Sequence, residues 1–171
     1  SSGFFAILGS MEQNKKTLQI LLVFSMILAA ALIRVLPHPY NFTPVAAMAL
    51  FGGRFISNKK FALLFSFGGL ILSDFVIGFH NTMPFVYGSF LLIIGLGMYL
   101  KHFKNAFSFI PAALLSSVLF FIITNFGVWM MGTMYSKDLN GLASCYLAAI
   151  PFLHWTLLGD LFYVGAFFGL Y

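Results

Sequence analysis

The chain has 171 residues, of which 61% are hydrophobic and 8% are charged, and its mean hydropathy is +0.98. A soluble domain of this length cannot bury so much apolar surface, so the composition excludes soluble classes and predicts a protein embedded in a lipid bilayer. The formal net charge of +5 does not indicate a nucleic-acid partner, because the basic residues stand singly or in pairs between apolar segments. The single cysteine, Cys145, excludes an intrachain disulfide framework and a cysteine-based zinc site.

Residues 1–10, SSGFFAILGS, precede Met11 and are interpreted as a tag or an upstream remnant. Residues 11–171 are predicted to form a single membrane domain, because the length suits one domain and no repeat of fixed period is visible.

The apolar segments predict an all-α bundle of six transmembrane helices, since about 20 residues cross a bilayer as a helix. The segments cover residues 17–36, 43–56, 61–79, 84–100, 107–131 and 142–171. The second segment is short for a crossing and begins with Pro44, a residue favoured in a first turn. The last is too long for one crossing, so Pro151 is predicted to separate an interfacial piece ending at Ile150 from the sixth span. Gly165 and Gly169 have the spacing of a close-packing face, which would lie within the bundle or at an oligomer contact.

The basic residues predict the orientation of this bundle. Three polar segments carry most of them, one before the first span, one between spans two and three, and one between spans four and five. With six spans, all three segments lie on the same side as the C-terminus. Their basic residues are Lys15, Lys16, Arg54, Lys59, Lys60, Lys101 and Lys104. Because loops rich in lysine and arginine stay inside, both termini are expected in the cytoplasm of a multi-pass protein of the cell inner membrane.

The unusual polar and aromatic residues gather toward the opposite, outward side. A charge at the bilayer centre costs ~3 kcal/mol on insertion scales, so such residues are expected to face other helices or a wet cavity. Pro37 and Pro39 end the first helix, and they should present His38 from irregular backbone. The set predicts an outward-facing pocket for a small solute: Arg34, His38, Asn41, Asp74, His80, Tyr87, Asn125, Trp129, His154 and Trp155.

Structural explanations exist for several members of this set. Arg34 and Asp74 would form an ion pair between two helices, which is compatible with a pocket. Asn125 would form hydrogen bonds between helices, and Trp129 and Trp155 would belong to an aromatic belt at the membrane interface.

Catalysis has no support in the sequence, because none of the common catalytic motifs is present and four acidic residues are too few for a two-metal site. No cofactor is expected. His38, His80 and His154 with Asp74 suggest a transition-metal site as an alternative, although their spacing matches no known motif.

Several short motifs resemble those of a bacterial family of six-helix membrane proteins. They are PHPYNFTPVAAMALFGG at residues 37–53, LSD at 72–74, TNFGVW at 124–129 and GDLFY at 159–163. That family is similar to the S components, the substrate-binding subunits of energy-coupling-factor vitamin transporters, and the likeness extends from Thr17 onward.

This resemblance implies a six-helix bundle that holds a vitamin or a metal-containing micronutrient near its extracellular face. It also implies a transmembrane coupling protein and ATPases as partners, which dock on an Ala-x-x-x-Ala face of the first helix. The nearest match here is Ser25 to Ala29. Solitary relatives take up cobalamin, and His38 would then be a ligand to cobalt. The expected function is therefore solute uptake, and the competing one is a non-transport membrane protein, such as an assembly factor, with a structural polar cluster.

Overall fold

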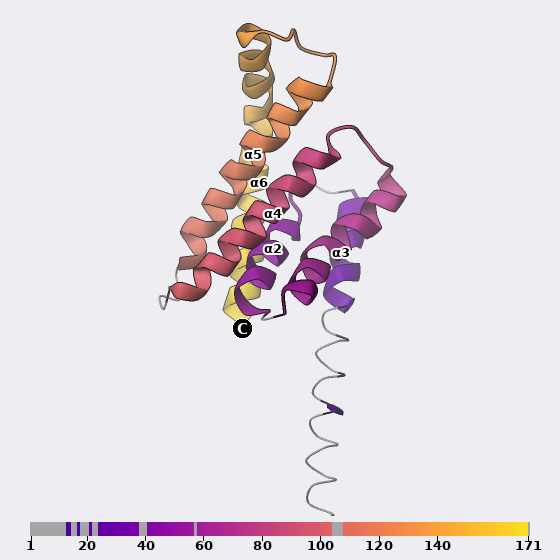
Figure 1. Ribbon diagram of the computed structural model, residues 1–171, viewed down its shortest axis with the longest axis vertical. Helices are drawn as coiled ribbons and strands as arrows, with labels where there is room; N and C mark the ends of the chain where they lie inside the picture. Colours follow the sequence, from indigo (N-terminus) through magenta and orange to yellow (C-terminus); the bar gives the residue numbers. More distant parts are fainter. Residues whose placement is uncertain are drawn as a thin grey trace, which may run out of the picture.

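The computed structural model describes residues 13, 14, 17, 21, 24–37, 41–56, 58–103 and 108–170. Over this part of the chain the protein is helical throughout, with irregular connections between the helices (Figure 1). The elements are an N-terminal helix Phe24–Val35, α2 (Val45–Phe55), α3 (Lys59–Ile77), α4 (Met83–Tyr99), the 3-10 turn η1 (Leu100–His102), α5 (Phe109–Met131) and α6 (Leu139–Leu170).

Four of these helices are long and apolar enough to cross a membrane, namely α3, α4 with η1, α5 and α6. The helices Phe24–Val35 and α2 are apolar but shorter. The all-α class is confirmed, whereas the count of six spans and the side of the termini stay predictions.

The predicted division of the last segment at Pro151 is wrong, because α6 is one helix of 32 residues. Proline removes one helical hydrogen bond, but helices in membranes tolerate this loss when neighbouring helices hold the chain. Here α5 forms hydrogen bonds with α6 on both sides of Pro151 and so holds the chain. The Tyr146 hydroxyl donates to the Ile122 carbonyl at 2.7 Å, and a hydrogen bond of 2.6 Å joins the Ser117 hydroxyl to Asp160 Oδ2.

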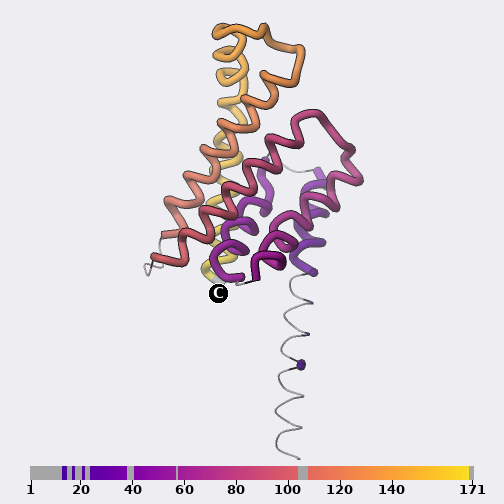
Figure 2. The backbone as a smooth tube through the Cα atoms, viewed as in Figure 1, coloured from indigo at the N-terminus to yellow at the C-terminus, as the bar shows by residue number. Residues whose placement is uncertain are grey.

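The centre of the molecule is α2, whose 11 residues lie between α3, α4, α5 and α6 (Figure 2). Alanine and glycine dominate its sequence, so its backbone can approach its neighbours closely. A Cβ atom at Gly53 would lie 2.3 Å from the Ile94 carbonyl of α4, and one at Gly97 of α4 would lie 2.3 Å from the Leu50 carbonyl of α2. Only glycine fits these two positions without moving a backbone.

The Gly165 and Gly169 pair does not form a close-packing face within the described bundle. A Cβ atom at either position would meet nothing within 4 Å. An oligomer contact is the remaining interpretation of this spacing.

One end of the bundle is held together by Arg54, in the last turn of α2. Its guanidinium donates to the carbonyls of Leu100 (2.7 Å) and Phe103 (3.2 Å) and to the Ser108 hydroxyl (3.2 Å). Cations at helix C-termini balance the partial negative charge of the last carbonyls. We call this the basic end, and Arg54, Lys59, Lys60 and Lys101 lie there.

At the opposite end, the α5–α6 hairpin extends beyond the α3–α4 loop (Figure 1). Asp138 caps α6 by accepting from the Gly141 amide (2.7 Å) and the Ser136 hydroxyl (2.8 Å). The Gly141 hydrogen bond lowers the pKa of this exposed carboxyl, so the cap is present at neutral pH and is lost as the pH falls through that lowered pKa. The Lys137 ammonium donates to the carbonyl of Trp129 and so caps the C-terminal end of α5.

The close contact of α2 and α4 can be tested by replacing Gly97 with alanine. The new methyl group would overlap the Leu50 carbonyl, so Gly97→Ala should lower the stability by about 1–3 kcal/mol and lower the melting temperature in detergent micelles. Gly95→Ala is the matched control, because a Cβ atom there meets nothing within 4 Å, and it should melt at or slightly above the parent. Equal melting temperatures for the two variants would contradict this packing.

Candidate functional site

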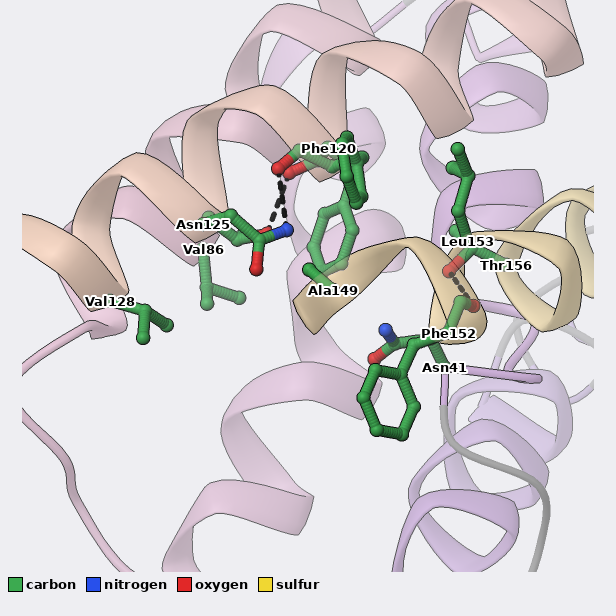
Figure 3. A pocket seen from close by; sticks show the side chains of 11 residues that line it. Asn41, Val86, Phe120, Asn125, Val128, Ala149, Phe152, Leu153 and Thr156 are labelled. Carbon is green, nitrogen blue, oxygen red and sulfur yellow. Dashed lines mark hydrogen bonds between the residues drawn. The ribbon is translucent and has the colours of Figure 1, made fainter. Parts of the chain in front are cut away.

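Two neighbouring cavities lie in the half of the bundle away from the basic end. Cavity A has a volume of about 500 Å³ and cavity B about 410 Å³, and Asn41, Val86 and Phe120 line both. The rest of cavity A is formed by Phe121, Thr124, Asn125, Val128, Ala149, Phe152, Leu153 and Thr156 (Figure 3). The rest of cavity B is formed by Arg34, Leu36, Pro37, Thr43, Val45, Leu70, Ile77, His80 and Phe90.

The segment before α2 borders both cavities, since Asn41 lines each of them and Thr43 lines cavity B. Asn41 has a backbone φ of 63°, a conformation that asparagine tolerates better than most residues, and its carbonyl accepts from the Thr43 amide at 3.0 Å. The next residue, Phe42, packs its ring on Tyr163 of α6, with centroids 5.5 Å apart. Its Cα lies 3.0 Å from where a Cβ of Gly159 would be, so this glycine lets the segment lie directly on α6.

Three polar side chains of cavity A form hydrogen bonds with their own helices. Thr124 donates to the Phe120 carbonyl at 2.7 Å, Asn125 to the Phe121 carbonyl at 2.8 Å, and Thr156 to the Phe152 carbonyl at 3.3 Å (Figure 3). These bonds use the hydrogens of both threonine hydroxyls and one of the two amide hydrogens of Asn125. The wall can therefore offer a ligand the side-chain oxygens as acceptors and the second Asn125 N–H as a donor. Phenylalanine rings supply most of the remaining surface.

Beside cavity B, the predicted ion pair of Arg34 and Asp74 is present, with 3.1 Å between Nη1 and Oδ1. The same Nη1 donates to the Ser73 hydroxyl at 2.7 Å and to the Leu70 carbonyl at 3.3 Å. The other oxygen of Asp74 accepts from the Tyr87 hydroxyl at 2.8 Å. The Asp74 side chain is 2% exposed and that of Arg34 is 18% exposed, so the carboxylate is enclosed while the guanidinium borders the cavity.

The structure therefore brings together six of the ten predicted site residues. Four line a cavity, namely Arg34, Asn41, His80 and Asn125. Asp74 and Tyr87 lie behind Arg34. Tyr87 joins α4 to α3 and stacks on Phe67 with 5.6 Å between centroids, so its ring packs between helices.

Three further predicted residues line neither cavity. The Trp129 indole donates to the Ser136 carbonyl at 2.8 Å and thereby shapes the α5–α6 loop. His154 and Trp155 lie on the exposed face of α6 with their rings 4.8 Å apart, whereas the neighbouring Leu153 and Thr156 face cavity A. The tenth, His38, lies outside the described residues, so its role stays a prediction.

The alternative of a histidine-lined metal site gains no support from the described residues, which contain no group of three potential metal ligands of the His, Cys, Asp and Glu types. His80 borders cavity B and His154 lines neither cavity.

Sequence reasoning missed the apolar walls of the cavities and their threonines. Phe120, Thr124 and Val128 recur at i, i+4 and i+8 of α5, and Phe121 and Asn125 form a second such pair, so both rows lie on one face of the helix. This spacing could have indicated the face, but it is also the ordinary pattern of packing against a neighbouring helix.

The composition and the fold are those of an all-helical, multi-pass membrane protein. The chain belongs to DUF6580, a family of unknown function, whose model matches residues 14–171. No curated protein and no solved structure matches the chain.

A double-mutant cycle can measure the coupling of Arg34 and Asp74. Arg34→Met leaves a buried carboxylate without its cation, and Asp74→Leu leaves a cation without its carboxylate, so each should cost about 3–5 kcal/mol of stability. The double variant should recover much of the loss in unfolding experiments, because it removes both charges together. Losses that simply add would show that the two residues act independently.

Proposed function

We propose that this protein is a membrane transport protein that binds a small solute in cavities A and B during uptake. The observation that carries the proposal is the pair of adjoining cavities, which share Asn41, Val86 and Phe120 and lie away from the basic end. Ligand sites typically combine mostly apolar walls with a few polar groups that fix orientation, and their volumes fall in this range. With the basic end in the cytoplasm, the cavities lie in the outward half of the bundle.

The lining residues favour a solute with one acceptor-bearing end and one apolar end. Arg34, His80 and the start of α2 border cavity B, and Pro44 provides no side-chain cap for that helix. Helix N-termini and guanidinium groups both attract carboxylates and carbonyl oxygens. The phenylalanine rings of cavity A would hold the apolar or aromatic end.

A vitamin-like micronutrient has this chemistry, in agreement with the resemblance to S components. The cavity volumes, about 500 and 410 Å³, favour a small vitamin over cobalamin, which is larger than either cavity. Coordination of cobalt by His38 is therefore the weaker form of the proposal.

An energy-coupling transmembrane protein with its ATPases is the corresponding proposed partner. Ser25 and Ala29 are exposed on the helix Phe24–Val35, whereas Ile27 and Ala30 are buried in the interior. The face of this helix that corresponds to the docking motif thus points away from the interior of the bundle.

The competing function is a non-transport membrane protein whose polar cluster is structural. One observation favours it, because Asp74 is enclosed by Arg34 and Tyr87 and lines neither cavity. A test must therefore change the cavities and leave this cluster intact.

Two adjacent alanines of α6 provide that test. Ala149 is buried and lines cavity A, whereas Ala148 is exposed. Purified protein would be screened against a panel of water-soluble vitamins by thermal unfolding, and a true ligand at 100 times its Kd should add about 2.7 kcal/mol of apparent stability. Ala149→Phe should fill cavity A and abolish the stabilisation, while Ala148→Phe should retain it.

The melting temperatures without ligand complete the experiment, since both variants must fold for the comparison to count. Equal stabilisation of the two variants would place the ligand elsewhere and contradict the proposed site. A panel in which no vitamin stabilises the parent would favour the structural alternative.

A further inference from the structure

A second buried acid, Asp160, lies at the inner end of cavity A. Its Oδ2 is 2.6 Å from the Ser117 hydroxyl of α5, and both residues are buried. Asp160 comes one helical turn after Thr156, and Ser117 one turn before Phe121, both of which line the cavity. The two helices run in opposite directions, so the Asp160–Ser117 pair lies one turn deeper than the cavity wall, on the side of the basic end.

Within the part of the chain that the structure describes, the elements packed against Asp160 bring no cation to it. The sequence of α5 contains no charged or titratable residue, and Arg54, the charged residue of α2, donates to carbonyls at the basic end. On α6 itself, His154 lies on the exposed face and the Tyr163 ring packs on Phe42. Asp160 thus differs from Asp74, which has a guanidinium within 3.1 Å.

The hydrogen bonds of Ser117 agree with a neutral carboxyl group. Its Oγ lies 2.6 Å from Asp160 Oδ2 and 3.1 Å from the Ala113 carbonyl, but a hydroxyl has a single hydrogen for these two acceptors. If Asp160 is a carboxylate, the hydrogen is directed to it and the Ala113 carbonyl receives none from Ser117. If Asp160 is protonated, its O–H donates to Ser117 and Ser117 donates to Ala113, so both contacts are hydrogen bonds.

Burial favours the same state, because an isolated carboxylate in apolar surroundings takes up a proton rather than remain charged. We propose that Asp160 is a proton-binding site, which carries a proton at neutral pH at the inner end of cavity A. When water or a solute group reaches the pair, the carboxyl O–H bond breaks and the proton passes to that acceptor. The Ser117 hydroxyl then turns its hydrogen from the Ala113 carbonyl to the new carboxylate. Coupling of this proton to solute movement rests on the proposed function, whereas the proton site itself does not.

Infrared difference spectroscopy tests the protonation state directly. The chain has four acidic residues, so a single Asp→Asn substitution removes a large part of the carboxyl signal. The parent spectrum minus that of Asp160→Asn at neutral pH should contain the C=O stretching band of a protonated carboxyl group. The matched difference for Asp74→Asn should contain carboxylate bands, because Asp74 is paired with Arg34. Carboxylate bands in the Asp160 difference would overturn the proposal.

Thermal unfolding provides an independent readout. Asp160→Asn replaces a neutral acid by a neutral amide of the same shape, so it should melt at or above the parent, whereas Asp74→Asn should melt well below it. As the pH is raised, the parent should lose stability relative to Asp160→Asn, because the asparagine has no proton to release. A pH-independent difference, or a loss as large as that of Asp74→Asn, would contradict a proton site. Neither readout needs a solute, so both are independent of the Ala149→Phe experiment.

Discussion

The close approach of α2 to α4 is the contact on which the rest of the bundle depends. With 11 residues, α2 is about 16 Å long at 1.5 Å per residue, roughly half the thickness of a bilayer core. It is stable in the centre because Gly53 and Gly97 let the two backbones meet, and because Arg54 binds the carbonyls that follow α4. A helix this short, which ends at the basic end, cannot extend to the membrane surface on the opposite side. The preceding segment therefore enters the bundle as irregular backbone, which is tolerated at such depth only where protein or water satisfies it.

The cavities and the polar cluster follow from this arrangement. Phe42 lies against α6, and Asn41 lines both cavities. Neither residue fills the space between α3, α4, α5 and α6 in the half of the bundle away from the basic end, and the unfilled volume is cavities A and B. Arg34 closes the side toward α3, where it pairs with Asp74 and donates to the Ser73 hydroxyl, and Tyr87 donates to the other oxygen of Asp74. The ion pair and the two cavities are thus neighbouring consequences of one short helix. The two buried acids differ in their surroundings, since Asp74 faces a guanidinium and Asp160 faces a hydroxyl.

Much of the helical pattern and part of the site could be predicted from the sequence. A run of apolar residues has no stable alternative to a helix in lipid, and a lone arginine in such a run needs a carboxylate, of which the chain has few. The continuity of α6 through Pro151 could not be predicted, because it depends on contacts with α5 on both sides of the proline. The cavity walls could not be predicted either. Phe120 and Val86 look like ordinary packing residues in the sequence, and an unfilled volume arises from the relative placement of four helices.

Water from the side opposite the basic end should reach the segment before α2, although that segment is part of the bundle. Cysteine labelling tests it in a Cys145→Ala background, with a membrane-impermeant thiol reagent added to intact cells. Asn41→Cys should react from outside, because Asn41 is exposed at both cavities, as should the positive control Met134→Cys in the α5–α6 loop. Ala47→Cys, at a fully buried position of α2, should stay unlabelled. An Asn41→Cys variant that does not react from outside, beside a reactive Met134→Cys, would contradict the outward-facing cavities.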